Sequence, residues 1–210
     1  MHQLTQAKSG IHGQNYTLSN PTINLNSETH LETVSLVVMQ VSHKTSTPST
    51  AISIRSHRAG DMGYITHRHA AVYAKEYGCN DHFEALVGRI TSDFLCNYDP
   101  TGERCWIAEA GGGFAGCIML VREHREPSTA RVRCFLVEDG ARGSGLGTRL
   151  MRGCIDAAKE LGYERVVLST SNLLGSARRL YAKFGFKLES KTERQEWGIK
   201  HVAETWAMDL

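Results

Sequence analysis

A glycine-rich turn between an expected strand and an expected helix constrains this chain more than any other feature. The turn reads Arg142-Gly143-Ser144-Gly145-Leu146-Gly147. Residues 132–137 before it favour a strand, and apolar residues recur at helical spacing from Leu146 to Leu161 after it. Glycines at a helix start leave backbone N–H groups open at the positive end of the helix dipole. The turn therefore predicts a phosphate site, with a pyrophosphate as the best fit.

Three interpretations of the turn compete. A dinucleotide-binding fold would need Gly-x-Gly-x-x-Gly after the first strand, whereas this turn comes late, with glycines at positions 143, 145 and 147. A nucleoside triphosphate loop would need Gly-Lys-Ser/Thr, a tripeptide that the sequence lacks. The third interpretation is a tight turn without a ligand, and the turn alone leaves it open.

The residues after the turn narrow the choice. A short apolar strand at 165–168 leads through Ser169-Thr170-Ser171-Asn172 into a second expected helix, and Gly185 can end that helix in the left-handed conformation. Together with the turn, Asn172 and the run Ala177-Arg178-Arg179-Leu180-Tyr181-x-x-Phe184-Gly185-Phe186 resemble the GNAT acyltransferase superfamily. The resemblance covers residues 51–210.

Three further motifs narrow the resemblance within the superfamily. Asp61-Met62-Gly63-Tyr64, Arg68-His69 and Glu204-Thr205-Trp206 are similar to the acetyltransferase half of bacterial MarR–GNAT fusion proteins.

The expected elements predict a single α/β sheet of mixed direction. They are strand 51–56, helix 62–77, helix 82–97, strands 104–109, 114–122 and 130–137, helix 145–161, strand 165–169, helix 173–184, and strands 186–190 and 201–208. The resemblance implies a GNAT-like, mostly antiparallel sheet flanked by helices, in the order β-α-α-β-β-β-α-β-α-β-β.

Composition places the expected domain at residues 50–210. The chain has 210 residues, 41% of them hydrophobic, and a net charge of +2, which indicates one core and no broad attraction to nucleic acid or membrane. Six scattered cysteines without a Cys-x-x-Cys pair predict free thiols in the cytoplasm and no metal site. Residues 1–49 are polar, with few charges, which predicts a disordered extension rather than a targeting peptide.

The resemblance implies acetyl-coenzyme A as cosubstrate. Arg142 and the turn would hold its pyrophosphate, and the exposed backbone of the strand before the turn would bond the pantetheine arm. Asn172 would bind that arm and also cap the second helix. A solvated arginine is the alternative for Arg142. The residues expected to bind the cosubstrate are Leu136, Val137, Arg142, Gly143, Ser144, Gly145, Leu146, Gly147, Thr148 and Asn172.

Tyr181 is the expected proton donor. The resemblance places a tyrosine here to protonate the departing thiolate, and a phenol with a pKa near about 10 can donate to a thiolate whose thiol has a pKa near about 8.5. Tyr181 also lies on the apolar face of its helix, so a core tyrosine is the alternative.

The general base is less defined. Many GNAT enzymes carry an acid on the strand before the turn, where this chain has Arg131-Val132-Arg133-Cys134-Phe135. The candidates for the general base therefore lie on the first two helices, where His69, Tyr73 and Glu76 share one face. His69 and Glu76 are the expected catalytic residues, and a polar surface helix is the alternative. Cys134 lacks a nearby paired histidine in the sequence, which disfavours a covalent mechanism.

These expectations combine into one function. The chain is expected to be a cytoplasmic N-acetyltransferase that transfers an acetyl group directly to a primary amine of a small molecule, without a metal. Two alternatives remain: an acyl-coenzyme A sensor without turnover, and another acyl-coenzyme A reaction on the same scaffold. No winged helix or basic recognition helix is evident, so no nucleic-acid partner is expected. A homodimer is left open.

Overall fold

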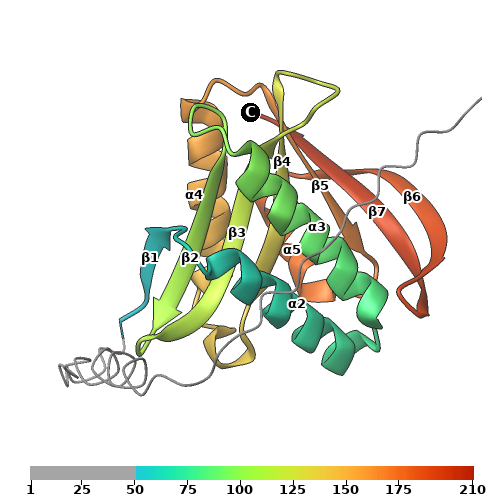
Figure 1. Cartoon of the computed structure of the whole chain (residues 1–210). Coiled ribbons are helices and arrows are strands. Elements are labelled where there is room, and N and C mark those ends of the chain that lie inside the picture. Colours follow the sequence, from blue (N-terminus) through green and yellow to red (C-terminus); the bar gives the residue numbers. More distant parts are fainter. Residues whose placement is uncertain (1–50) are drawn as a thin grey trace, which may run out of the picture. The chain divides into compact units, whose positions relative to one another are not determined.

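The computed structural model describes residues 51–210, and the expectations for residues 1–49 lie outside this range. One seven-stranded sheet runs through the described part, in the order β1-β2-β3-β4-β5-β7-β6 (Figure 1). The strands are β1 (Ser53–Ser56), β2 (Arg104–Ala110), β3 (Gly113–Arg122), β4 (Thr129–Val137), β5 (Arg165–Ser171), β6 (Lys187–Glu196) and β7 (Ile199–Asp209). The helices are α2 (Asp61–Tyr77), α3 (Asp81–Asn97), α4 (Leu146–Glu160) and α5 (Gly175–Phe184), with a 3-10 turn at Asp139–Ala141.

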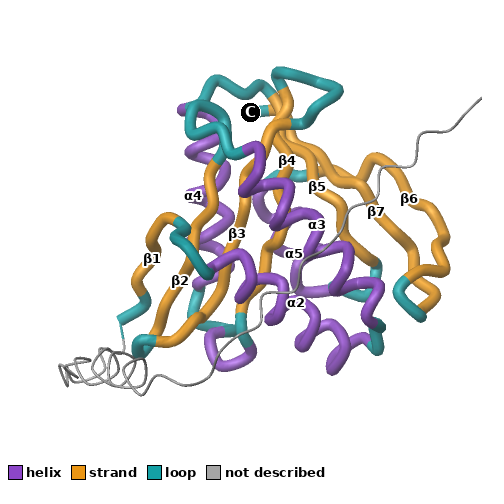
Figure 2. Tube along the Cα trace, in the orientation of Figure 1, coloured by secondary structure: helices purple, strands orange, loops and turns teal. Residues whose placement is uncertain are grey.

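Helices cover both faces of the sheet, and the alternation of side chains along β3 explains why (Figures 1 and 2). Ile118 and Leu120 point to one face and belong to the core formed with α4 and α5. Cys117 and Met119 point to the other face and pack with α2 and α3. Because both faces of β3 are buried, the strand reads as a continuous apolar run. The expected fold class and element order are confirmed.

The sheet opens between β4 and β5, the one parallel pair among the described strands. Their pairing ends at Val132 and Leu168, so the last five residues of β4 have no partner on β5. A bulge lies at this point: the β3–β4 register steps from Met119↔Arg133 to Cys117↔Leu136, which leaves two residues of β4 opposite one of β3. Backbone hydrogen-bonding groups at the end of β4 therefore face an open seam.

Cys134 is the residue that makes this bulge. Its φ of 44° lies in the left-handed region that L residues rarely adopt. The Cys117 thiol donates to the Cys134 carbonyl at 3.0 Å and helps to hold it. Strain of this kind persists where surrounding structure fixes it, and it is common beside functional sites.

The final hairpin is longer than expected. Strands were predicted at 186–190 and 201–208, but β6 and β7 extend toward each other and meet at a two-residue turn. The turn residues, Trp197 and Gly198, have φ values of 56° and 79°, the conformation that matches the twist of a tight hairpin. The Trp197 carbonyl accepts from the backbone N–H of Asn80 at 2.8 Å, which ties the hairpin to the α2–α3 connection.

The expectation that Asn172 caps the second helix is wrong. α5 begins at Gly175 with Leu174 as its N-cap residue, and no side chain caps it. Asn172 instead continues the pairing of β5 with β7: its N–H donates to the Val202 carbonyl at 3.0 Å, and its Oδ1 accepts from the Val202 N–H at 2.9 Å. Two bonds to a neighbouring strand replace the local helix cap. Within residues 51–210, no helix has the length and apolar character needed to cross a membrane.

Candidate active site

The glycine turn and the start of α4 present backbone N–H groups that are open to a ligand. Gly143 and Gly145 have φ values of 78° and 83°, and a Cβ at either position would meet no atom within 4 Å. No side chain caps α4, and the backbone bonds of the helix begin with the Arg149 N–H to the Gly145 carbonyl at 3.0 Å. The Gly147 and Thr148 amides have no hydrogen-bond partner among residues 51–210. Free amides at a helix start suit a phosphate group.

A cleft of about 650 Å³ extends from this helix start. It lies between the end of β4, the glycine turn and the starts of α4 and α5, and the guanidinium-bearing side chains of Arg142 and Arg179 line it. Its free amides and arginines fit the phosphates of a coenzyme A, and the unpaired end of β4 fits its pantetheine arm. The expected cosubstrate residues that line the cleft are Leu136, Val137, Arg142, Gly143, Gly145, Leu146, Gly147 and Thr148.

Two of the expected cosubstrate residues do not line the cleft. Ser144 bonds within the turn, where its hydroxyl donates to the Ala141 carbonyl at 2.6 Å. Asn172 pairs with β7, as described above. Both stabilise the backbone beside the cleft.

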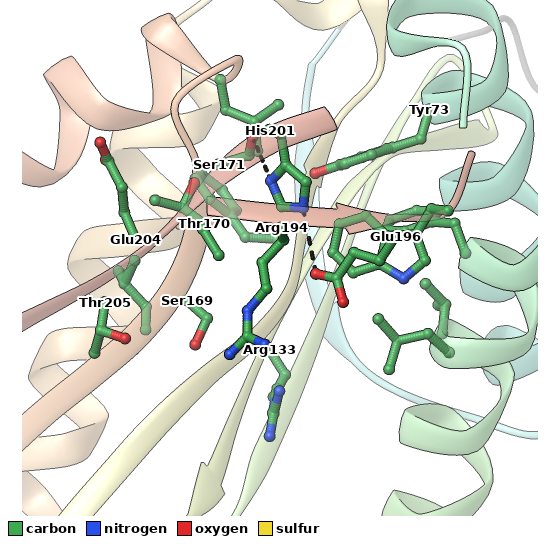
Figure 3. Close-up of a pocket in the computed structure, with 18 of the residues that line it drawn as sticks. Tyr73, Arg133, Ser169, Thr170, Ser171, Arg194, Glu196, His201, Glu204 and Thr205 are labelled. Carbon is green, nitrogen blue, oxygen red and sulfur yellow. Dashed lines mark hydrogen bonds and ion pairs between the residues drawn. The ribbon is translucent and has the colours of Figure 1, made fainter. Parts of the chain in front are cut away.

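A second cavity, of about 570 Å³, lies on the other side of the open seam. Its walls are the apolar residues of α3, the middle of β4, the end of β5 and the β6–β7 hairpin (Figure 3). Polar and charged side chains reach into it from several strands: Arg133, Ser169, Thr170, Ser171, Arg194, Glu196 and His201. A cavity that combines apolar walls with convergent polar groups is typical of a small-molecule site.

The two cavities meet at four side chains, Tyr73, Phe135, Leu174 and Tyr181, which line both. Tyr181 is only 5% exposed, and its ring packs near Phe135, Phe186 and Trp206. Burial raises the pKa of the Tyr181 phenol, and the nearby Thr170 hydroxyl partly offsets this. Tyr181 is thus both a core residue and a protonated group at the junction.

The two residues expected to act as base, His69 and Glu76, lie in different surroundings. Glu76 lines neither cavity; it accepts from Arg142 at 2.7 Å. His69 lines the second cavity, where its Nδ1 lies 2.9 Å from the Ile65 carbonyl. Its buried Nε2 has no hydrogen-bond partner among the described residues. Burial lowers the pKa of His69 to about 4, so the ring is neutral at pH 7.

His201 forms a hydrogen-bonded chain that the sequence pattern did not reveal. The buried ring lies with Nδ1 3.1 Å from the Ser171 hydroxyl and Nε2 3.2 Å from a Glu196 carboxylate oxygen (Figure 3). In the tautomer that satisfies both partners, Nε2–H donates to Glu196 and the Nδ1 lone pair accepts from Ser171. Trp197 stacks on the ring at 4.9 Å between centroids and fixes its orientation.

Cys134 remains a protonated thiol. Burial raises its pKa to about 12. Because the thiolate is the reactive form of cysteine, a thiol with this pKa is a weak nucleophile at neutral pH. The expectation against a covalent cysteine mechanism therefore gains a physical reason.

The motifs quoted for the MarR–GNAT resemblance make structural contacts. Arg68 on α2 donates to both Glu138 carboxylate oxygens, at 2.7 and 2.9 Å, and anchors the loop after β4. Glu204 is buried and accepts from Arg178 on α5 and from the Trp206 indole, both at 2.9 Å. These pairs tie elements together around the two cavities.

Membership in a family follows from a family model that matches this arrangement. The model of the acetyltransferase (GNAT) family matches residues 73–186, which include the junction, the glycine turn and α5. The chain belongs to the GNAT family. Relatives named N-acetyltransferases agree with acyltransferase activity. Among residues 51–210, no group of three or more His, Cys, Asp or Glu side chains is placed to hold a metal ion.

Curated GNAT relatives match about half of the chain. The N-acetyltransferase family 8 member 2 of Rattus norvegicus is 36% identical over 113 residues, 52% of this chain and 50% of that protein. The N-acetylaspartate synthetase of Danio rerio is 32% identical over 94 residues, 45% of this chain and 33% of that protein. The uncharacterized N-acetyltransferase YvbK of Bacillus subtilis is 29% identical over 105 residues, 50% of this chain and 66% of that protein. The match thus spans from a third to two thirds of these relatives.

Solved GNAT structures share the fold. A GCN5-related N-acetyltransferase from Kribbella flavida superposes with a TM-score of 0.62 at 18% identity, over 76% of this chain and 98% of that one. The acetyltransferase yncA from Salmonella typhimurium, solved with its cofactor acetyl-CoA, gives a TM-score of 0.59 at 17% identity, over 76% and 94% of the two chains. At these identities the superpositions show the fold alone.

Proposed function

We propose that this GNAT protein transfers an acetyl group from acetyl-coenzyme A directly to a primary amine of a small molecule. One observation carries the proposal: a cleft suited to phosphates and a second cavity with both apolar and polar walls meet at Tyr181, in the open seam of the sheet. Each reactant would enter from its own side and meet the other at the seam. Holding two reactants in this way supplies much of the rate of a bimolecular transfer.

The chain's own groups account for cosubstrate binding. The amides of Gly147 and Thr148 and the guanidinium of Arg142 would hold the phosphates, and Arg179 lines the same cleft. The backbone of Leu136 and Val137 would bond the pantetheine arm, as an added strand does. Asn172 pairs with β7 at the end of β5, and it would stabilise the backbone there beside the pantetheine arm. When bound, acetyl-coenzyme A supplies the activated acetyl group.

Tyr181 is the proposed donor to the departing thiolate. Its raised pKa keeps the phenol protonated at neutral pH, so the proton is available at the moment of departure. A buried, water-poor junction strengthens a hydrogen bond to a developing negative charge.

His201 is the proposed proton acceptor for the amine. Ser171 and His201 both line the cavity, and the Ser171 hydroxyl lies 3.1 Å from His201 Nδ1, so Ser171 can take a proton from the ammonium and pass its own to His201, while Glu196 stabilises the imidazolium that forms. His69 is a second candidate, but burial disfavours its charged ring and its Nε2 has no hydrogen-bond partner among residues 51–210. Glu76 pairs with Arg142, which lines the cosubstrate cleft, and this pairing suits a role in binding.

The wider setting is also part of the proposal. A cytoplasmic location agrees with the free cysteines. A relation to MarR–GNAT fusion proteins rests on the sequence motifs alone.

A screen of primary amines, with release of free coenzyme A as the readout, tests this function. The panel includes amino acids, polyamines, amino sugars and peptides, each at saturating acetyl-coenzyme A. We expect thiol release with at least one small amine and acetylation of its nitrogen by mass spectrometry. Tight binding of coenzyme A without release for any amine would contradict the proposal and favour a coenzyme sensor.

A further inference from the structure

Two arginines in the second cavity have no ion-pair partner among residues 51–210. Arg133 on β4 and Arg194 on β6 both line the cavity, and neither side chain forms an ion pair or hydrogen bond with a residue of that range. Figure 3 shows the Arg194 side chain reaching toward Ser169, with the Arg133 side chain next to it. Neighbouring like charges repel each other, and an anion bound between them removes this repulsion.

Three neighbouring arginines form ion pairs within the protein, in contrast to Arg133 and Arg194. Arg131, two residues before Arg133 on the same strand, pairs with Glu123 and donates to the Ser169 hydroxyl at 3.2 Å. Arg142 and Arg178 pair with Glu76 and Glu204. Arg131, Arg142 and Arg178 are thus neutralised within the protein, whereas Arg133 has no ion pair although it is half-buried.

Burial makes the missing partner costly. It lowers the pKa of the Arg133 guanidinium, the charge of Arg131 lowers it further, and the charge of Glu123 offsets part of this effect. A guanidinium stays protonated in proteins, so the half-buried charge persists and is stabilised further when an anion binds beside it. A carboxylate matches this group well, because its two oxygens accept a pair of parallel N–H bonds.

We propose that the acceptor is an amine that carries a carboxylate, such as a free amino acid, and that Arg133 and Arg194 bind this carboxylate. The inference rests on the proposed N-acetyltransferase function and names its substrate class. The carboxylate would lie beside Ser169 at the β4–β6 side of the cavity. The amine would then point toward Ser171 and the junction at Tyr181, and the apolar remainder would contact Phe83 and Trp197.

Pairs of amines that differ only in the carboxylate test the substrate class. We would compare tryptophan with tryptamine, phenylalanine with phenethylamine, and leucine with isoamylamine, and include phosphoethanolamine to represent phosphate-bearing amines. We expect catalytic efficiency at least 10-fold higher for the amino acid of at least one pair. Equal use of both members of every pair, or preference for phosphoethanolamine, would overturn the inference while leaving the acetyltransferase function standing.

Substitutions test the two arginines. Arg133→Gln should raise the KM for the amino acid by about 10- to 100-fold, because a charge-assisted hydrogen-bonded pair is lost. The kcat, the KM for acetyl-coenzyme A and the efficiency with the decarboxylated amine should change little, and Arg133→Lys should recover part of the loss. Arg194→Gln, at an exposed strand position, should act in the same direction. Lys191→Gln, on the same strand but outside the cavity lining, is the matched control.

Binding provides a readout that does not depend on turnover. Calorimetry of the amino acids in the presence of coenzyme A should show binding by the unsubstituted protein and none by Arg133→Gln at the same concentrations. If no amine is acetylated but this binding is present and lost on substitution, the proposed function fails and the carboxylate site stands. An unchanged amino-acid affinity in folded Arg133→Gln and Arg194→Gln variants would overturn the inference.

Discussion

Arg142, in the glycine turn, donates from Nη2 to Oε1 of Glu76 on α2 at 2.7 Å, at the edge of the cosubstrate cleft. This pair joins a residue expected to bind phosphate and a residue expected to act as base. The Arg142 side chain is 42% exposed, so the ion pair is screened by water and is worth about 0–1 kcal/mol. An anion of higher charge can therefore displace Glu76 from Arg142.

Glu76→Gln distinguishes a role of Glu76 in cosubstrate binding from a role as the general base. If Glu76 competes with phosphate for Arg142, the substitution should lower the Kd of coenzyme A by a few-fold and leave kcat nearly unchanged. If Glu76 were the base, kcat would fall by about 100- to 10,000-fold. Calorimetry and steady-state kinetics give the two values, with Glu160→Gln, an exposed carboxylate at the far end of α4, as the charge-matched control.

Gly147→Asp tests the donor site. A Cβ here would meet Leu180, Phe135 and Val137 at 3.6 to 3.7 Å, ordinary contact distances, so the helix tolerates the residue while its carboxylate enters the cleft. We expect the rise in Tm on adding coenzyme A to disappear, because a ligand stabilises a protein only while it binds the native state. Gly153→Asp makes the same change on the exposed face of α4 and should keep the full rise. An undiminished rise with folded Gly147→Asp would remove the helix start from the site.

Tyr181→Phe tests the proton donor. The ring that packs with Phe135, Phe186 and Trp206 is kept, and only the hydroxyl is lost. We expect kcat at saturating amine to fall by about 100- to 10,000-fold with little change in coenzyme affinity.

Tyr163→Phe is the matched control for this substitution. Its buried hydroxyl donates to the Gly102 carbonyl at 2.8 Å, away from both cavities, so its loss should lower the free energy of unfolding by about 1 kcal/mol and spare turnover. Wild-type turnover in Tyr181→Phe would assign Tyr181 to the core alone.

His201→Gln tests the proposed base. At pH 7 we expect kcat to fall by about 100- to 10,000-fold, and Glu196→Gln should cause a smaller loss, since it removes only the stabiliser of the imidazolium. The deficit should shrink as pH rises toward the pKa of the amine, because a neutral amine needs no base. A deficit that is constant with pH would indicate a structural role, and His82→Gln, at an exposed position on α3, controls for loss of a histidine.

His69 predicts a pH dependence of stability. Its folded pKa of about 4 lies below its unfolded value of about 6.5, so the unfolded chain binds more protons between these values. This contribution to stability is complete above pH 6.5 and is lost as pH falls toward 4, up to about 3 kcal/mol.

Denaturant unfolding at pH 7, 6 and 5 measures this effect. His69→Asn, which keeps an amide donor near the Ile65 carbonyl, should flatten the profile, and His67→Asn, an exposed histidine on the same helix, should leave the slope unchanged. A steep profile in His69→Asn would mean that other groups cause the acid sensitivity.

The sequence predicted the fold and the position of the glycine turn at the start of α4, because both depend on local chemistry. The glycines at 143, 145 and 147 and the apolar period of α4 lie within one short stretch. The length of β6 was missed because its ten residues are all exposed, so the strand carries no apolar alternation. The prediction that Asn172 caps a helix was wrong because its side chain bonds to the backbone of β7 instead.

The acceptor side could not be assembled from the sequence. Arg133, Arg194 and His201 come from three strands, and only the folded sheet brings them to one cavity. One signal was present: β4 carries Arg131 and Arg133 where many GNAT enzymes have an acid. The bulge at Cys134 left no such signal, since a cysteine in a left-handed conformation has no sequence signature.

The two cavities share only four side chains, and this separation has an evolutionary consequence. The donor cleft is built from the end of β4 and the starts of α4 and α5, whereas α3 and the β6–β7 hairpin supply most of the acceptor wall. Mutations in α3 or the hairpin can therefore change which amine is accepted without weakening the binding of acetyl-coenzyme A. A gene duplicate of such a protein is free to explore new acceptors while it inherits a working acetyl source.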